Sequence, residues 1–245
     1  MLPHEPSIPH RVSPTPPRAN LLLAALPEVE YERLIAYLKP VSLSTGDILY
    51  EGDFIPTAYF LTEGLVSLMR LSAQCAATVV GLVSCEGMVG IRPILSGAQF
   101  DRATVQIGGN AWCMPTEELR EEFKRGGTLQ AQVLRHFQAI LAQTSQSGMC
   151  NRLHTAEERL CRWLLTISDR VGRNDLHLTP EFMEHLLGMH RDGLTTTADG
   201  LQAKGLIDYT PGHITILDRA EMESAACECY GVIRHEFERL FRQPK

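Results

Sequence analysis

The side chains best suited to recognition chemistry lie in the segment RDGLTTTADGLQAKGLIDY, residues 191 to 209. At helical spacing this segment buries little beyond Leu194, Ala198 and Leu201. The rest of its surface, with the residue before it, is short and polar: His190, Arg191, Asp192, Thr195, Thr196 and Asp199. Such a surface can come close to a flat partner that forms hydrogen bonds, as a recognition helix does in the major groove of DNA. An ordinary solvated helix surface is the alternative interpretation.

The residues around this helix predict the fold that would position it. Thr179 is a helix cap, Pro180 stands at the first helical position, and Gly188 can form a tight corner before the second helix. The following LIDY, TPGH and ITIL are typical of a β-hairpin with a Pro-Gly turn. The segment therefore predicts a helix-turn-helix followed by a wing.

A long helix is expected before this domain, from Thr128 to a break near His154. Its heptad-like seam consists of Val133, Phe137, Ile140 and Thr144. Such a seam needs a partner helix, which predicts a homodimer; a helix buried within its own monomer is the alternative. A second stripe of Leu134, Phe137 and Leu141 is expected to pack on the preceding domain. Thr155 and Glu158 then stand at capping-box spacing, which makes the break a candidate hinge.

The N-terminal half has a different pattern of residue types. Residues 1–19 hold six of the fourteen prolines and predict a flexible arm. Asn20 is a good cap for one or two short helices, and residues 41–114 show the short strands and turns of an antiparallel barrel or roll. The predicted division is an arm at 1–19, a β-roll sensor domain at 20–127, a dimerisation helix and hinge at 128–154, and a winged-helix domain with a C-terminal helix at 155–245.

Composition and motifs exclude several classes of protein. The only apolar run near the start, LLLAAL, is too short to span a bilayer, and no signal peptide precedes it, so a cytoplasmic protein without a membrane segment is expected. Because the net charge is −6, only a local basic patch could contact nucleic acid. No activated nucleophile, carboxylate pair or phosphate-binding loop is evident, so no enzymatic activity is expected.

The seven cysteines predict reduced thiols, because their number is odd and no CxxC pair exists. Cys75, Cys85 and Cys113 are interpreted as buried apolar side chains rather than oxidation sensors. Cys227 and Cys229 would lie on different faces of a helix, and no third or fourth ligand is apparent. The sequence therefore predicts neither a metal site nor a cofactor.

Three segments, in this order, resemble the Crp/Fnr family of bacterial transcription regulators. STGDILYEGDFIPTAYFLTEGLVSL resembles the opening of the family's cyclic-nucleotide-binding roll, NRLHTAEERLCRWLL its hinge, and LTPEFMEHLLGMHRDGLTTTADGLQAKGLIDY its winged helix. The resemblance covers the chain from Asn20 onward. It implies an α+β chain with a double-stranded β-helix as its roll, and a homodimer whose recognition helices enter major grooves about 34 Å apart. RNA polymerase is a candidate partner.

The resemblance also marks a degenerate effector pocket at Gly90, Ile91 and Arg102. In ligand-binding members a glutamate after the glycine holds the ribose and a later arginine holds the cyclic phosphate. Ile91 replaces that glutamate, so cyclic AMP is not expected to bind, and Arg102 either forms a structural salt bridge or holds a different anion. The chain also lacks the N-terminal cysteines and roll histidines of iron–sulfur and haem sensors. The effector stays unidentified.

In the predicted recognition helix, the resemblance assigns roles residue by residue. Arg191 and Asp192 stand where the family reads base edges, and Thr196 occupies the next such position. The candidates for phosphate contacts are His190, Thr195, Lys204 and His213. From 179 to 219 three cations oppose six acids, a net charge of −3. The arginines expected to supply the missing positive field precede this segment: Arg152, Arg159, Arg162, Arg170 and Arg173.

The sequence thus predicts a homodimeric, sequence-specific DNA-binding transcription regulator whose roll governs the angle between two winged helices. The alternative is a small-molecule or second-messenger binding module with a weak or vestigial DNA-binding domain, which the acidic winged helix favours.

Overall fold

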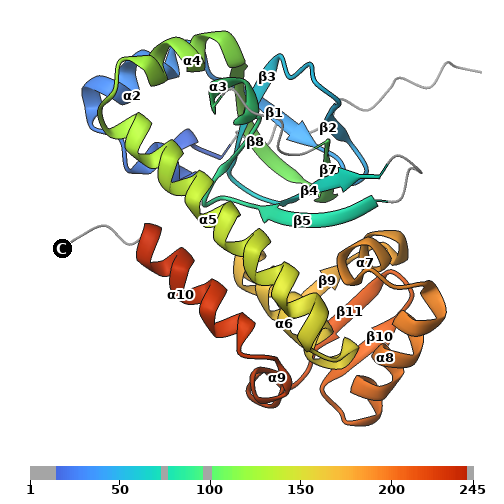
Figure 1. Cartoon of the computed structure of the whole chain (residues 1–245). Helices are drawn as coiled ribbons and strands as arrows, with labels where there is room; N and C mark the ends of the chain where they lie inside the picture. The colour runs from blue at the N-terminus through green and yellow to red at the C-terminus, as the bar shows by residue number, and fades with distance from the viewer. Residues whose placement is uncertain (1–14, 73–76, 96–100, 242–245) are drawn as a thin grey trace, which may run out of the picture.

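The computed structural model describes residues 15–72, 77–95 and 101–241. A roll of antiparallel strands lies above a winged-helix domain, and the long helix α5 (Gly127–Leu153) runs from one to the other (Figure 1). This is the predicted α+β architecture. Residues 1–14, most of the expected arm, lie outside the described residues.

Two four-stranded antiparallel sheets form the roll. Their strands are β1 (Lys39–Leu43), β2 (Ile48–Glu51), β3 (Thr57–Leu61), β4 (Leu65–Leu71), β5 (Ala77–Val83), β6 (Met88–Val89), β7 (Arg102–Ile107) and β8 (Gly109–Pro115). One sheet has the order β1-β8-β3-β6 and the other β2-β7-β4-β5. Leu61, Val66 and Val105 belong to the apolar core that joins the two sheets. The roll predicted from short β-branched runs is confirmed.

Short N-terminal helices pack on the roll: η1 (Pro17–Ala19), α1 (Leu21–Ala24) and α2 (Glu28–Ile35). Asn20 caps α1 as predicted, and its buried amide also donates to the carbonyls of Leu61 (2.8 Å) and Gly87 (2.7 Å). Residues 15–19, assigned from sequence to the flexible arm, lie against the roll instead. The indole of Trp112 donates to the Thr15 carbonyl at 2.8 Å, and Pro17 is buried.

Glu30 of α2 fixes the start of α5. After α3 (Arg92–Leu95) and α4 (Thr116–Lys124), the chain turns and the amides of Thr128 and Leu129 donate to the two Glu30 carboxylate oxygens at 3.0 and 2.8 Å. A carboxylate at a helix N-terminus satisfies free amides and complements the helix dipole. Glu30 therefore supplies the cap, and Thr128, where the helix was predicted to begin, lies inside it.

The two apolar stripes of α5 differ in exposure from what the sequence predicted. Val133 and Ile140 of the expected dimer seam are 0% and 1% exposed, because they pack into the apolar clusters of the roll and the N-terminal helices. Leu134 and Leu141 are 45% and 54% exposed.

The other two seam residues follow the same pattern. Phe137 packs half-buried against the cluster that holds Val133, and the Thr144 hydroxyl donates to the Val80 carbonyl at 2.9 Å. In this conformation the predicted seam packs on the roll of its own chain. This agrees with the alternative interpretation, a helix face buried within the monomer.

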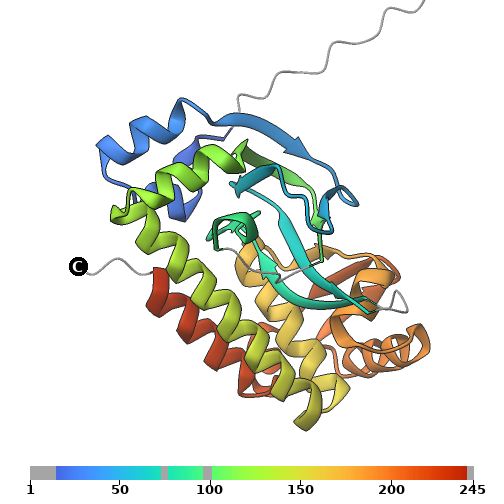
Figure 2. The same cartoon turned by 45° about the horizontal axis from the view of Figure 1, so that its top comes forward.

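The C-terminal domain contains the predicted helix-turn-helix and wing. Its elements are α6 (Ala156–Val171), β9 (Asp175–His177), α7 (Pro180–Leu187), α8 (Arg191–Ala203), β10 (Ile207–Thr210), β11 (His213–Ile216), α9 (Arg219–Ala225) and α10 (Cys229–Phe241). Thr155 and Glu158 form the expected capping box, and the wing strands join β9 in the order β10-β11-β9. Helix α10 returns alongside α5 in the opposite direction (Figure 2).

His136 joins α5 to the roll from a fully buried position. Its Nε2 lies 3.2 Å from the Met88 amide nitrogen and 2.9 Å from the Met88 carbonyl oxygen. The ring fills the space in front of Gly87, where any Cβ would overlap it. Burial lowers the pKa of His136 from 6.5 to about 4 because the charged form is poorly solvated there.

We expect His136 to make the fold sensitive to mild acid. The unfolded chain binds a proton below about pH 6.5 whereas the folded chain resists it to about pH 4, so stability falls across this window as pH falls. Wild-type protein should lose about 2 kcal/mol of unfolding free energy from this group between pH 7 and 5. His136→Gln should be less stable at pH 7 and lack this component. Denaturant unfolding at both pH values checks it, and equal losses in the two proteins would contradict it.

Candidate DNA-binding interface

The turn between α7 and α8 is held by local capping. Thr179 accepts a hydrogen bond from the Phe182 amide at the start of α7, as predicted. Gly188 ends the helix in the left-handed conformation with φ 62°, and its amide donates to the Glu184 carbonyl at 2.8 Å. Arg159 of α6 donates to the carbonyl of Leu187, so the preceding helix supports the turn.

Helix α8 has one buried and one exposed side. Leu194, Ala198 and Leu201 are buried in the domain core, as predicted. Arg191, Asp192 and Thr196 are exposed together on the outer side. Within the described part of the chain, Arg191 and Asp192 have no side-chain hydrogen bond or ion pair, while the Thr196 hydroxyl donates to the Asp192 carbonyl at 2.9 Å. The arginine and the aspartate are therefore free to contact an external partner.

The predicted phosphate contacts fall into two groups. His190 is the N-cap residue of α8, where unpaired amides favour an anion, and Thr195 lies one turn further along the helix. Lys204 forms an ion pair with Glu157 of α6. His213 on the wing hydrogen-bonds to Asp175, and its ring stacks on that of His177 with centroids 4.7 Å apart. The carboxylates of Glu157 and Asp175 offset the positive charge that the second group could offer.

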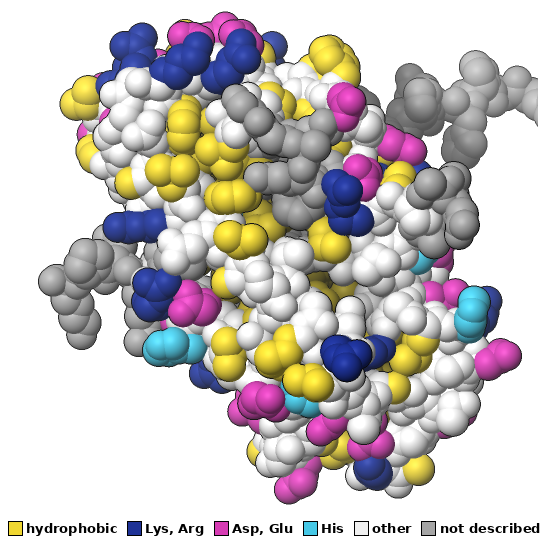
Figure 3. Space-filling model, viewed as in Figure 1, with side chains coloured by type: hydrophobic (Ala, Val, Ile, Leu, Met, Phe, Trp, Pro, Cys, Tyr) yellow, Lys and Arg dark blue, Asp and Glu magenta, His cyan; other side chains and the backbone are white. Residues whose placement is uncertain are grey.

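The positive field expected from the preceding arginines is largely missing. Arg162 is 0% exposed, and Arg170 lies in the domain interface with its Nη1 3.6 Å from Oε1 of Glu86. Arg152 and Arg173 are exposed. Figure 3 shows acidic and basic side chains interspersed over the lower part of the molecule, without a basic patch on that face. Arg162 and Arg170 differ from the prediction because they lie on the buried side of α6.

The three residues predicted to form a degenerate effector pocket lie in different local environments. Gly90 has φ 95°, and Ile91 is buried in the cluster formed with the N-terminal helices. Arg102 donates to Glu51 of β2 at 2.9 Å, which is the structural salt bridge that the sequence left as one of two alternatives. Residues 96–100 of the same segment lie outside the described residues.

The half-buried roll cysteines do not have the environment of oxidation sensors. Burial raises the pKa of the Cys85 and Cys113 thiols, and a raised pKa lowers the reactive thiolate fraction. Cys75, the third cysteine considered, lies outside the described residues.

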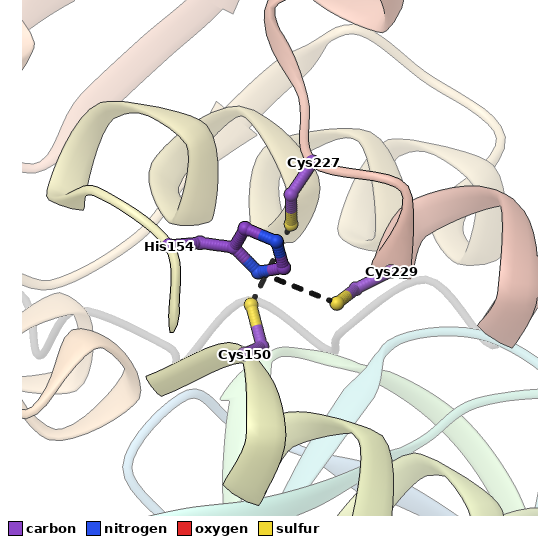
Figure 4. Close-up of side chains that lie close together, drawn as sticks. All are labelled: Cys150, His154, Cys227 and Cys229. Atoms are coloured by element: carbon purple, nitrogen blue, oxygen red, sulfur yellow. Dashed lines mark hydrogen bonds between the residues drawn. The ribbon is translucent and has the colours of Figure 1, made fainter. Parts of the chain in front are cut away.

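The prediction that Cys227 and Cys229 lack further ligands is wrong. Cys150 and His154, at the end of α5, lie beside them, and all four ligand atoms fall within 4.8 Å of one another (Figure 4). Cys150 and Cys227 are 77 positions apart in the chain, so no local spacing could reveal the cluster. The sequence signal for this pair was the i, i+4 spacing of Cys150 and His154 at the end of the predicted helix.

A helix-turn-helix with an exposed polar second helix and a β-wing defines a DNA-binding protein, here joined by a long helix to a sensor-type roll. Residues 158–225 match the Crp-like helix-turn-helix domain. The C-terminal part of the chain therefore contains a Crp-like helix-turn-helix domain. Among the described helices, none is long and apolar enough to cross a membrane.

Known proteins resemble the chain over most of its length. It is 24% identical over 200 residues to a global nitrogen regulator from Synechocystis sp., which covers 76% of this chain and 89% of that protein. FixK2 from Bradyrhizobium japonicum has a TM-score of 0.67 at 14% identity, covering 78% of this chain and 98% of its own. The c-di-GMP responsive regulator CLP from Xanthomonas campestris has a TM-score of 0.64 at 16% identity, covering 78% and 100%. The two solved structures share the fold.

Replacement of Arg191 by alanine tests base reading. We expect a loss of about 1 to 3 kcal/mol at the cognate site and relaxed preference at one base pair, because a bidentate contact to guanine is removed. Competition binding against single-base variants at fixed salt measures both. The control is Arg173→Ala, which removes an exposed cation outside α8 and should weaken all sequences slightly and equally. If Arg191→Ala behaves like this control, Arg191 is a phosphate contact.

Proposed function

We propose that the protein is a homodimeric, sequence-specific regulator in which the roll at 20–127 sets the position of the winged helix at 155–245 through the helix and hinge at 128–154. The observation that carries the proposal is the exposed α8 surface. Arg191 and Asp192 project from it unpaired, within the described part of the chain, while Leu194 and Leu201 anchor its other side in the core.

Each exposed residue of α8 has a chemistry suited to base edges. Arg191 would donate to the O6 and N7 of guanine, and Asp192 would accept from the N4 amine of cytosine. Thr196 would contact a thymine methyl group or a phosphate. His190 and Thr195 are the better placed phosphate contacts, because Lys204 and His213 already face Glu157 and Asp175.

The exposed stripe of α5 is the proposed dimer contact, in place of the seam predicted from sequence. Leu134 and Leu141 are seven residues apart and Gly148 follows after another seven, the repeat that a left-handed pair of helices requires. All three are exposed, whereas Val133 and Ile140 are committed to the roll. A second copy of the same helix, related by a two-fold axis, would cover the stripe and place two α8 helices symmetrically.

The roll can influence the winged helix through a buried polar contact. Arg170, near the end of α6, meets Glu86 of the roll, with side-chain exposures of 8% and 10%. A ligand that bound two hinge conformations unequally would shift their populations by its differential affinity. Cyclic AMP is not proposed as that ligand, because Ile91 is buried in an apolar cluster and Arg102 is paired with Glu51.

Selection from a random duplex library tests the proposed function. The purified full chain, without added ligand and at low salt, should enrich a two-fold symmetric motif with half-sites one helical turn apart. Arg191→Ala protein, selected in parallel, should enrich a motif degenerate at one position in each half. Failure of the wild-type protein to enrich any motif would contradict ligand-independent, sequence-specific binding.

Charge on the exposed stripe should separate the subunits. Leu134→Glu with Leu141→Glu should give folded monomers that lose the symmetric motif, because like charges would face each other across the two-fold axis. The control is Ile48→Glu, which charges an equally exposed apolar side chain on the roll and should stay dimeric. Light scattering measures the mass and circular dichroism the fold. Persisting dimers would place the interface elsewhere.

A further inference from the structure

Four side chains with metal-binding atoms converge where α5 ends and α10 begins (Figure 4). Cys150 and His154 come from the last turn of α5 and the residue after it, Cys227 from the segment before α10, and Cys229 is the first residue of α10. The sulfur atoms of Cys150 and Cys227 are 3.5 Å apart, and the Cys229 sulfur lies 3.6 Å from Nδ1 of His154. The three cysteines are buried and the histidine nearly so.

We propose that Cys150, His154, Cys227 and Cys229 bind a single tetrahedral metal ion, with Zn²⁺ as the expected ion. Zinc bond lengths of about 2.3 Å to sulfur and about 2.0 Å to nitrogen place tetrahedral ligands about 3.8 Å apart for two sulfurs and about 3.6 Å apart for sulfur and nitrogen. The observed separations of 3.5 and 3.6 Å match that arrangement. An iron–sulfur cluster distributes its ligands over several irons and needs a wider set.

The neighbours of the four ligands already have the arrangement of a metal site's surroundings. Nε2 of His154 lies 3.0 Å from Oε2 of Glu228, which favours a proton on Nε2 and leaves the Nδ1 lone pair directed at the sulfurs. The Gln146 amide donates to the Cys229 sulfur at 3.1 Å, a contact suited to a thiolate. Glu228 is thus a positioning residue that orients the histidine ring.

Charge balance at Arg162 supports an anionic site. This guanidinium is 0% exposed, and its electrostatic neighbours are the sulfurs of Cys150, Cys227 and Cys229. In the described part of the chain it has no carboxylate partner, and its Nε and Nη2 have no hydrogen-bond partner. A buried cation needs a counter-charge. Three thiolates, a neutral imidazole and a divalent ion sum to −1, which supplies it.

The ion would connect the end of α5, the link to α6 and the start of α10. The relative position of these three segments determines the angle at the hinge. His154 is the extended residue between α5 and α6, and the two C-terminal cysteines hold the start of α10 against it. Bound metal would lock this junction, and its loss would free the winged helix to move relative to α5. This consequence rests on the proposed DNA-binding function, whereas metal binding itself does not.

Metal analysis of the untagged full chain, purified under reducing conditions, tests the site. We expect about one zinc per chain by mass spectrometry, and chelator-treated protein should regain it. Reloading with Co²⁺ should give thiolate-to-cobalt charge-transfer absorption and the intense visible bands of tetrahedral coordination. A folded protein that binds no metal, that shows no thiolate band with Co²⁺, or that yields only a Cys150–Cys227 disulfide would overturn the proposal.

Matched variants separate a ligand role from a structural one. Cys229→Ser and His154→Asn should lose the ion, whereas His154→Cys keeps a ligand and should retain it. Glu228→Ala should lower affinity by about tenfold or more, because the ring loses its orienting acceptor, whereas Glu228→Gln keeps an acceptor oxygen and should have a smaller effect. Cys113→Ser, outside the cluster, and His177→Gln, in the exposed group with Asp175 and His213, are controls that should bind normally. Retention by Cys229→Ser with loss in His177→Gln would move the metal to the wing.

Parallel selection of zinc-loaded and chelated protein distinguishes this inference from the proposed function. If metal analysis finds zinc in the loaded protein only, equal enrichment by the two forms would overturn the hinge lock and leave the metal site. Enrichment by neither form, with zinc bound, would refute the DNA-binding proposal alone.

Discussion

The packing of α5 on the roll is the contact on which the rest of the arrangement depends. Val133, His136 and Ile140 bury one face of the helix against the sensor domain. Because α5 is continuous over 27 residues, it is about 40 Å long and carries that orientation unchanged to its far end. The last turn therefore presents Cys150 and His154 at a fixed place, and α6 and α10 assemble around it. The same packing also decides which leucines remain exposed.

The junction between the roll and the winged helix combines an apolar cluster, which includes Leu65 and Val79 of the roll and Phe182 of α7, with one buried ion pair. Arg170 and Glu86 meet there with both side chains largely removed from water, and the arginine also lies over the Phe237 ring at 4.4 Å. The attraction within a buried ion pair exceeds the free energy lost on desolvation by little. Such a pair therefore fixes the orientation of the two domains more than it adds stability. Moving the winged helix away from the roll would also expose the apolar cluster that the two share, so repositioning it costs more free energy than breaking the ion pair alone.

Local signals in the sequence predicted most elements of the fold. Contacts between segments that are distant in the chain could not be predicted from such signals. Asn20, the Thr155 capping box and Gly188 specify helix ends through neighbouring residues alone, and all three behave as expected. The two stripes of α5 differ by one position, so periodicity could not decide which one faces the roll. In the site, the exposed face of α8 was predictable from its short polar residues. The burial of Arg162, and its neighbours from α5 and α10, depended on segments distant in the chain.

The acidic winged helix changes what must supply affinity for DNA. Non-specific binding comes mainly from cations that displace counterions, and this domain offers few exposed ones beyond Arg173 and Arg191. Base contacts from α8 must then provide a larger share of the binding free energy. A single half-site contacted by one free arginine binds weakly. Two half-sites engaged at once multiply their effects only if the spacing of the two α8 helices is correct. A DNA-binding domain of this charge would therefore depend on the spacing of the two α8 helices more strongly than a basic one, and in the proposed dimer a metal-locked junction at His154 would act directly on affinity.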